Sequence, residues 1–386
     1  MVEKQNYLYE KIFNFIKRKI EAGEYAPGQQ VPSEKELCSL FNVSTITAVR
    51  ALIELERAKY IVRRKGSGSF VSSTDEINIS REDTNFGEKM IALIVPFDTK
   101  EGKMFECVRG ISSYLKDKDY YLTIHNSQSD FKIEEQLLYK MQKSNVRGVI
   151  LYPLVTSQNV EVLNVMNANR YPIVTIDKYY DGVPISAVVA DNFRGGYLAA
   201  EEHINNGHKR IAFVTDARIN DKSSLRDRHH GYCQALVDHG ISIDPELIVC
   251  WDNDYFKVIE KAAGSQEEIF KQVHEKVVLE LKEKNVTAFC VSHDHLALRL
   301  MNLCSELGIN IPDDLAIVGF DNIPMLNYMT PALTTIEQDF YSIGYTSAEI
   351  LMDQIEGKNR LYTKEIIPVK FIEGESSCRK NMAKSS

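Results

Sequence analysis

Residues 43–52 read V-S-T-I-T-A-V-R-A-L, and they are the clearest structural signal in the chain. Ser44 is a residue type that caps helices, and apolar residues at helical spacing follow it. The stretch therefore predicts a helix from residue 44 to about residue 59. The buried stripe of this helix is expected to consist of Ala48, Ala51, Leu52 and Leu55.

A second helix is expected directly upstream. Residues 32–37 read P-S-E-K-E-L, in which Ser33 and Glu36 have the spacing of a capping box. Only a short turn at Asn42 and Val43 separates the two helices. Two helices joined in this way form a helix-turn-helix, whose second helix enters the major groove of DNA by its N-terminal end.

The surrounding residues complete a winged unit. Apolar residues spaced four apart predict an amphipathic helix over about residues 5–22. Residues 60–62 and 69–71 read as strands, and the basic segment 63–68 reads as a hairpin tip that can lie on DNA phosphates. The expected DNA contacts are Ser33, Lys35, Ser44, Thr45, Ile46, Thr47, Arg50, Arg64, Lys65, Gly66 and Ser67.

This unit resembles the winged helix-turn-helix of the GntR family of bacterial regulators. The shared motifs are Y-x-P-G at residues 25–28, V-P-S-E-K-E-L at 31–37, V-S-x-x-T at 43–47, A-L at 51–52 and G-x-G-x-F-V at 66–71. The family usually has arginine where Lys35 and Thr45 stand, and often where Val49 stands. Loss of a bidentate arginine argues against guanine reading at that point, whereas DNA binding is still expected.

Composition and charge predict a chain with more than one folding unit. The 386 residues exceed one ordinary core, and their net charge of −8 combines a mildly basic head with an acidic remainder. No long apolar run and no secretory signal are present, so we expect a cytoplasmic protein without membrane contact. The seven scattered cysteines lack a C-x-x-C motif, which predicts free thiols.

The pattern changes after a polar linker expected at residues 73–88. Residues 91–95 read I-A-L-I-V, which is typical of a strand buried on both faces. Similar runs then alternate with helical stretches to the end of the chain. This alternation predicts an α/β fold of two lobes, each a doubly wound parallel sheet with helices on both faces.

Polar and aromatic residues follow most of these apolar runs. In doubly wound sheets, ligands bind beyond the carboxyl ends of the strands. Carboxylates, amides and aromatic rings suit the hydroxyl groups of a sugar, although each such residue can equally cap a helix or turn a loop. The strand-end candidates are Phe97, Asp98, Asp177, Lys178, Asp216, Trp251, His293, Asp294 and Asp321.

Neither a metal site nor a catalytic site is expected. His293 and His295 are two residues apart and therefore point to different faces, and no third ligand is near in sequence. The chain has no G-x-S-x-G, no P-loop, no H-E-x-x-H and no G-x-G-x-x-G after a strand. We therefore predict no enzyme activity and no cofactor.

The body resembles the periplasmic-binding-protein-like effector domain of the LacI/GalR regulators. The matching segments lie within about residues 89–375 and include D-N-x-x-G-G at 191–196, R-x-x-G-Y at 228–232, G-I-x-I-P-D-D-L-A-I-V-G-F-D at 308–321 and P-x-L-T-T-I at 331–336. By position, the resemblance implies effector contacts from Asp177, Arg228 and Asp321. It also places in the cleft the residue before Asp294, which is commonly Asn in that family and is His293 here.

The lobes are expected to exchange chain at three crossovers. These should lie near residue 192, at residues 337–339 and at residues 358–362. The expected domains are a head at 1–72, a linker at 73–88, and a body at 89–386 with an N-lobe at 89–191 and 338–358 and a C-lobe at 192–337 and 359–386.

A GntR-like head on a LacI-like body resembles the AraR type of sugar-responsive repressor. The resemblance implies a homodimer that binds double-stranded operator DNA near carbohydrate-utilisation genes and a monosaccharide between its lobes. Cleft closure by the sugar would release the DNA, although promotion of DNA binding is physically just as possible.

Two alternatives differ in function. A sugar-binding protein that never touches DNA is disfavoured by the V-S-T-I-T head and by the missing signal peptide. A regulator of the same architecture can respond instead to a carboxylic acid, a purine or a sugar phosphate. Anionic ligands are disfavoured by four cleft carboxylates, Asp98, Asp177, Asp294 and Asp321. The cations that can offset them are Lys178, Arg228 and His293.

Overall fold

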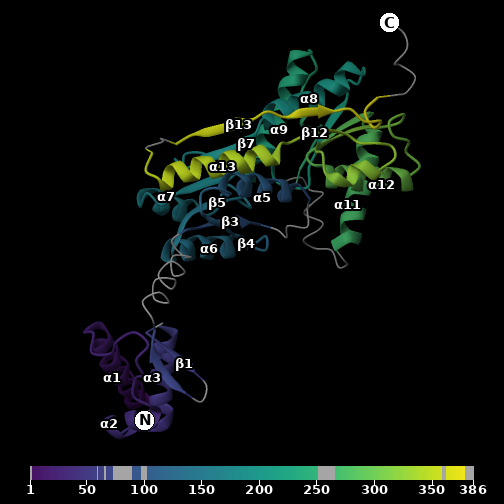
Figure 1. Cartoon of the computed structure of the whole chain (residues 1–386). Helices are drawn as coiled ribbons and strands as arrows, with labels where there is room; N and C mark the ends of the chain where they lie inside the picture. Colours follow the sequence, from purple (N-terminus) through teal and green to yellow (C-terminus); the bar gives the residue numbers. More distant parts are fainter. Residues whose placement is uncertain are drawn as a thin grey trace. The chain divides into compact units, whose positions relative to one another are not determined.

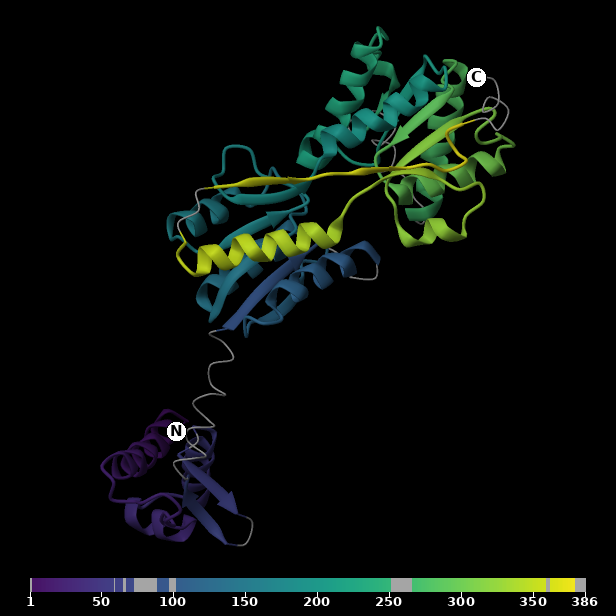
Figure 2. The same ribbon diagram turned by 45° about the horizontal axis from the view of Figure 1, so that its top comes forward.

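The computed structural model describes residues 2–58, 60–64, 67–72, 89–96, 102–250, 266–358 and 362–378. The chain divides into two compact units, Met1–Gly87 and Glu88–Ser386, and both are drawn in Figures 1 and 2. Each unit is considered by itself. The expected linker at residues 73–88 lies outside the described residues.

The first unit packs three helices against a two-stranded hairpin. Its elements are α1 (Val2–Glu21), α2 (Glu34–Phe41), α3 (Thr45–Arg57), β1 (Ile61–Arg64) and β2 (Gly68–Val71). The apolar stripes of all three helices and both strands meet in one core. That core contains Ile12, Ile16, Val31, Leu37, Ala48, Ala51, Leu52, Leu55, Ile61 and Val71. The four residues expected to form the stripe of α3 are therefore confirmed as buried.

The caps of α2 and α3 form as their sequence predicts. Ser33 and Glu36 make the complete capping box, and the Ser44 side chain accepts a hydrogen bond from the backbone of Thr47. Asn42 ends α2 in the left-handed conformation at φ 50°, which asparagine adopts more readily than most residues. This cap–turn–cap sequence confirms the predicted helix-turn-helix geometry.

The second unit contains two six-stranded sheets, one in each lobe. The N-lobe sheet has the order β13-β7-β6-β5-β3-β4, and every neighbouring pair is parallel. Its strands are β3 (Met90–Val95), β4 (Tyr121–Asn126), β5 (Val146–Leu151), β6 (Ile173–Ile176), β7 (Ser186–Ala190) and β13 (Lys364–Ile367).

Helices cover both faces of the N-lobe sheet, as Figure 2 shows. They are α5 (Gly102–Leu115), α6 (Phe131–Lys143), α7 (Val160–Ala168) and α13 (Phe340–Ile355). Ile91 and Leu93 of β3 pack in the core formed with α5 and α13, whereas Ala92 and Ile94 pack with α6 and α7. Alternate residues of one strand thus enter opposite cores, which explains its unbroken apolar sequence.

The C-lobe repeats this plan. Its sheet has the order β14-β12-β11-β10-β8-β9, and only β14 is antiparallel to its neighbour. The strands are β8 (Ile211–Val214), β9 (Ile248–Val249), β10 (Ala288–Val291), β11 (Ala316–Asp321), β12 (Thr334–Glu337) and β14 (Lys370–Ile372). The helices are α8 (Asn192–Asn205), α9 (Ser223–Asp238), α11 (Gln266–Glu283) and α12 (Asp294–Glu306), with short 3-10 turns η2 (Ile219–Asp221), η3 (Pro245–Leu247) and η5 (Pro324–Tyr328). The predicted α/β fold is confirmed.

One predicted crossover is misplaced. The chain passes between lobes after β7, again after β12, and a third time between β13 and β14. The third passage was expected at residues 358–362, with all residues from 359 assigned to the C-lobe. That assignment is wrong, because Lys364–Ile367 pairs with β7 and extends the N-lobe sheet before the chain crosses at Pro368 and Val369.

All seven cysteines are free thiols, as predicted. Among the described residues, no single helix is long and apolar enough to cross a membrane. Only the bent pair Glu34–Phe41 and Thr45–Glu56 reaches that length and composition together, with a 115° bend between its halves. The apolar side chains of this pair belong to the core of the head.

The head should depend on the side of α2 that faces its core. Leu37 is 0% exposed and Leu40 is 62% exposed on the same helix. Leu37→Ala is expected to lower the free energy of unfolding of the head by about 2–5 kcal/mol. Leu40→Ala is the matched control and should change it by less than about 0.5 kcal/mol. Calorimetry of the full chain measures both, and equal effects would contradict this packing.

Candidate DNA-binding surface and ligand pocket

The N-terminal end of α3 presents its side chains to solvent. Five of the predicted DNA contacts, Lys35, Ser44, Thr45, Ile46 and Arg50, are exposed. Ile46 is 78% exposed, which is unusual for an apolar side chain in the first turn of a helix. The guanidinium of Arg50 lies 4.3 Å from the centre of the Tyr9 ring. This end of α3 thus offers hydroxyls, one apolar side chain and one cation, the groups that contact bases and phosphates.

Two other predicted contacts serve the helix caps. Thr47 is only 5% exposed, and its hydroxyl lies 3.0 Å from that of Ser44. The expectation that Thr47 meets DNA is therefore wrong, because its side chain closes the cap of α3. The hydroxyl of Ser33 donates to Glu36 at 2.7 Å, although Ser33 itself stays exposed.

An ion pair joins the hairpin to α2. It is made by Arg63, which was expected to lie in the hairpin tip. Arg63 lies within β1, and its guanidinium is 2.7 Å from a carboxylate oxygen of Glu34 on α2. Ser67 is exposed, and its carbonyl accepts a hydrogen bond from Gln30. The side chain of Arg64, together with Lys65 and Gly66, lies outside the described residues.

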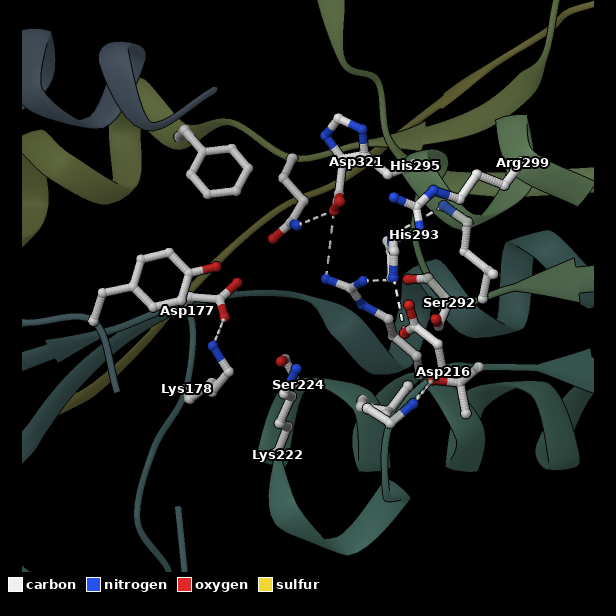
Figure 3. Close-up of a pocket in the computed structure, with 18 residues that line it drawn as sticks. Asp177, Lys178, Asp216, Lys222, Ser224, Ser292, His293, His295, Arg299 and Asp321 are labelled. Atoms are coloured by element: carbon white, nitrogen blue, oxygen red, sulfur yellow. Dashed lines mark hydrogen bonds and ion pairs between the residues drawn. The ribbon is translucent and has the colours of Figure 1, made fainter. Parts of the chain in front are cut away.

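A cavity of about 400 Å³ lies between the two lobes of the second unit. Figure 3 shows Asp177 and Lys178 on one side of it and Asp216, Ser292 and His293 on the other. The polar lining includes Tyr152, Asp177, Lys178, Asp216, Lys222, Ser224, Arg228, Ser292, His293, Arg299, Asp321 and Gln338. Five predicted effector contacts, Asp177, Lys178, Arg228, His293 and Asp321, are therefore brought together. Phe97, Asp98 and Trp251 lie outside the described residues.

Asp177 and Lys178 form a buried ion pair at the end of β6. Their carboxylate and ammonium groups are 2.6 Å apart, and neither residue is more than 5% exposed. Burial alone would raise the pKa of Asp177, but the charges of Lys178 and Arg228 lower it overall. Burial lowers the pKa of Lys178 to about 8 against the attraction of Asp177. The pair stays charged near neutral pH, with the ammonium close to its titration range.

Arg228 is held in place from three directions. It donates from Nε to Asn192 at 2.8 Å and from Nη1 to the carbonyl of Ser292 at 2.6 Å. Its Nη2 lies 3.6 Å from Asp321, and its guanidinium stacks 3.6 Å from the centre of the Phe320 ring. A guanidinium with this many partners presents its remaining donors to the cavity in one fixed direction.

Asp216 and His293 form a second charge pair across the C-lobe end of the cavity. His293 Nε2 lies 3.1 Å from Asp216, and its Nδ1 accepts from Leu296 and so caps α12. Burial opposes protonation of the ring, but the charge of Asp216 raises the pKa of His293 overall. Burial would also raise the pKa of Asp216, whereas His293 lowers it well below its usual range.

Asp294 was predicted to contact the effector, but the structure places it outside the cavity lining. It is 0% exposed and is not among the residues that line the cavity. Its two carboxylate oxygens accept from the Thr335 hydroxyl at 2.6 Å and from the Ile323 backbone at 3.0 Å. Burial raises the pKa of Asp294 to about 7. The side chain therefore ties α12 to β12 behind the cavity wall.

Several lining residues were missed, and their signals in the sequence differ. Ser292 directly follows β10, so the strand-end rule, which did select Asp216 after β8, could have found it. Lys222 and Ser224 lie at the start of α9, and Gln338 lies at the second crossover, where no motif marks them. Ser292 Oγ and Gln338 Oε1 are buried without a hydrogen-bond partner, so each can bond to a ligand in the cavity.

A set of contacts outside the cavity joins the two lobes. The Tyr179 hydroxyl of the N-lobe is 3.1 Å from both carboxylate oxygens of Asp227 on α9. Arg226 of α9 reaches Asp181 at 2.7 Å, and the Thr156 backbone donates to the carbonyl of Asp221 at 2.7 Å. Most of these contacts reach the start of α9, which also carries cavity residues.

Two family models match separate parts of the chain. Residues 8–71 match the model of bacterial regulatory proteins of the gntR family. Residues 200–377 match the model of the periplasmic-binding-protein-like domain. The chain thus combines a segment similar to the GntR regulators with a segment similar to periplasmic-binding-protein-like domains.

Individual similar proteins are transcriptional regulators by name. The chain is 28% identical over 347 residues to the arabinose metabolism transcriptional repressor of Geobacillus stearothermophilus, which covers 88% of this chain and 89% of the relative. It is 27% identical over 255 residues to the repressor PurR of Aliivibrio salmonicida, covering 66% of this chain and 71% of the relative. A ribose-bound LacI family regulator from Enterococcus faecium superimposes with a TM-score of 0.60 at 26% identity, covering 75% of this chain and 99% of the regulator.

The Asp216–His293 pair predicts a pH dependence. Because the folded-state pKa of His293 is raised, the pair stabilises the fold fully below the unfolded value of about 6.5 and loses this effect as pH rises through the folded pKa. Asp216 remains ionised throughout that window, since its pKa is lowered. Asp216→Asn should lower the pKa of His293 and destabilise the protein more at about pH 6 than at high pH.

Histidine ring titration by NMR measures this shift, and His293→Gln identifies the signal. Urea unfolding at the two pH values measures the stability. An unchanged His293 titration in Asp216→Asn would show that the two side chains do not form this pair.

Proposed function

We propose that this protein is a sequence-specific DNA-binding repressor whose operator affinity changes when a monosaccharide binds between its lobes. DNA binding is supported by the capped, solvent-facing start of α3 followed by a hairpin. Repression is supported by similarity along most of both chains to an arabinose metabolism repressor. We propose operator DNA of carbohydrate-utilisation genes as its target and the cytoplasm as its location.

The observation that carries the sugar assignment is the mixed polar lining of the cavity. Carboxylates at Asp177 and Asp321 accept hydrogen bonds from hydroxyl groups, and Arg228 donates to them. Ser292 and Gln338 add buried groups that have no partner in the protein. A dense set of donors and acceptors around about 400 Å³ suits a small molecule with many hydroxyls.

Ligand binding can act on the head because the lining comes from both lobes. A ligand that touches Asp177 and Arg228 together favours the closed arrangement of lobes over any open one. Tyr179, Asp227 and their neighbours add interlobe bonds to the same arrangement. We propose that two bodies pair as a homodimer, so that closure changes the spacing of two heads on a pseudo-palindromic operator.

A second candidate effector has one specific observation in its favour. The chain is also similar to PurR of Aliivibrio salmonicida, so a purine ligand is the alternative to a sugar. The described lining offers Phe340 and Tyr152 as rings that could stack on a base. The direction of the response, release or promotion of DNA binding, follows from which lobe arrangement the operator prefers. We propose release.

The docking of α3 predicts the effect of one substitution on DNA binding. Arg50→Ala should weaken operator binding and lower its salt dependence by about one counterion if Arg50 contacts a phosphate. Arg194→Ala removes the same charge from an exposed site on α8 and is the matched control. Fluorescence anisotropy with operator DNA at several salt concentrations measures both. Unchanged binding by Arg50→Ala and by Lys65→Ala together would contradict this docking.

The sugar assignment predicts ligand-induced stabilisation and DNA release. At a concentration of about 100 times its Kd, the effector should stabilise the body by about 2.7 kcal/mol, and the same compound should lower operator affinity. A thermal-shift panel of pentoses, hexoses, their acids and phosphates, and purines identifies the compound. A response to purines alone would contradict the assignment of a sugar effector, but it would be consistent with a ligand-responsive regulator.

The hydrogen bonds between the lobes allow a test of whether lobe closure controls the release of DNA. Tyr179→Phe removes the hydroxyl that bonds Asp227 without altering the cavity lining, so release should need about two- to tenfold more effector. Tyr171→Phe removes a hydroxyl that bonds only within the N-lobe and should leave the requirement unchanged.

A further inference from the structure

We propose that the monosaccharide bound in this cavity carries an acidic group, either a carboxylate or a phosphate. This inference rests on the proposed function and narrows the ligand class of the same site. It reverses the expectation from sequence, in which four carboxylates in the cleft argue against an anionic ligand.

The first step is that the described carboxylates of the cavity already have basic partners. Asp177 bonds Lys178 at 2.6 Å, Asp216 bonds His293 at 3.1 Å, and Asp321 lies 3.6 Å from Arg228. Asp294 does not line the cavity, and both of its oxygens bond to protein groups. The carboxylates therefore leave little net negative charge for a ligand to meet.

The second step is an additional positive charge. Lys222 also lines the cavity, and within the described part of the chain it takes part in no ion pair. Besides burial, repulsion from Lys222 contributes to the lowered pKa of Lys178; besides His293, attraction by Lys222 contributes to the lowered pKa of Asp216. Cations that repel one another around a cavity would all be stabilised by an anion placed among them.

The third step is the backbone around Lys222. α9 begins at Ser223, Lys222 stands at its N-cap without a side-chain cap, and Ser224 of the first turn lines the cavity. The first backbone N–H groups of a helix and its dipole favour a negative group at this end. Lys222, the Ser224 hydroxyl and the start of α9 thus form one candidate anion subsite, which Figure 3 shows below the centre of the cavity.

A second, independent group points to the same ligand. Ser292 is 3% exposed and lines the cavity, and its hydroxyl is buried without a partner. Gln338 also lines the cavity; its Oε1 has no partner, and its amide donates to Asp321 at 2.6 Å. The cavity therefore offers acceptors for sugar hydroxyls in one part and unneutralised positive charge in another. A sugar with an acidic group satisfies both, whereas a neutral sugar leaves Lys222 only the attraction of Asp216.

The test compares matched compounds on the full chain by calorimetry. The sets are glucose, gluconate, glucuronate and glucose 6-phosphate, and arabinose, arabinonate and arabinose 5-phosphate, with succinate as an acid that is not a sugar. We expect one acidic member to bind at least about tenfold more tightly than its neutral parent. The comparison also shows whether the acidic group is a carboxylate or a phosphate, because both derivatives of the same sugar are measured.

Substitutions of Lys222 test whether the acidic group binds at this residue. Lys222→Gln should remove most of the preference for the acidic member over its neutral parent, whereas Lys222→Arg should retain the preference. Lys209→Gln, at an exposed lysine outside the cavity, controls for net charge and should have no effect. Unchanged melting temperatures without ligand establish that the variants fold.

Three outcomes would overturn either the acidic sugar or the position of its anion at Lys222. Equal or tighter binding of a neutral parent would reject the acidic group while leaving the proposed sugar-responsive repressor intact. Equal binding of succinate would show that charge alone is recognised. A preference for acids that survives Lys222→Gln would place the anion elsewhere. Binding of purines without any of these sugars would instead reject the sugar part of the proposed function.

Discussion

The second unit is organised around the buried guanidinium of Arg228, which is 8% exposed. A buried cation is costly unless its donors are satisfied. Here the acceptors come from Asn192 at the start of α8, Ser292 after β10 and Asp321 at the end of β11. One side chain on α9 therefore fixes the positions of two helices and two strand ends, and these are the elements that form the C-lobe wall of the cavity.

Glycines allow this arrangement. A Cβ on Gly196 would come within 2.0 Å of the carbonyl oxygen of Arg228, and one on Gly231 within 1.9 Å of that of Phe193. α8 and α9 consequently cross with their backbones in contact, which brings Asn192 within reach of Arg228. The motifs D-N-x-x-G-G and R-x-x-G-Y thus have a physical explanation: each supplies one polar partner and the glycine that lets the other helix approach.

Charge pairing within the cavity then determines what it can bind. In the described lining, three carboxylates face three basic side chains, and each pair fixes the direction of its members. Because both lobes contribute to the lining, the same side chains that select a ligand also favour one arrangement of the lobes. The interlobe bonds at Tyr179 act on that arrangement from outside the cavity. The contacts between the two lobes therefore affect both which ligand fits the cavity and which arrangement of the lobes is favoured.

Local signals determined much of this protein. The caps at Ser33 and Ser44 and the apolar stripe of α3 specify the helix-turn-helix, because capping and helical periodicity involve residues only a few positions apart. The same holds for the buried strands of both lobes, and for Asp177 and Asp321 at strand ends, since the carboxyl ends of parallel strands meet at one edge.

Only the tertiary structure decided the features that depend on distant partners. Asp294 turns inward because its partner lies on a strand about forty residues away. β13 joins the N-lobe sheet because the edge of β7 is available to it. The described lining is less acidic than expected because Lys222 lines the cavity and Asp294 does not. The sequence determines which residue types are present. Their charge state and side-chain direction depend on burial and on hydrogen-bond partners, and both of these exist only in the folded chain.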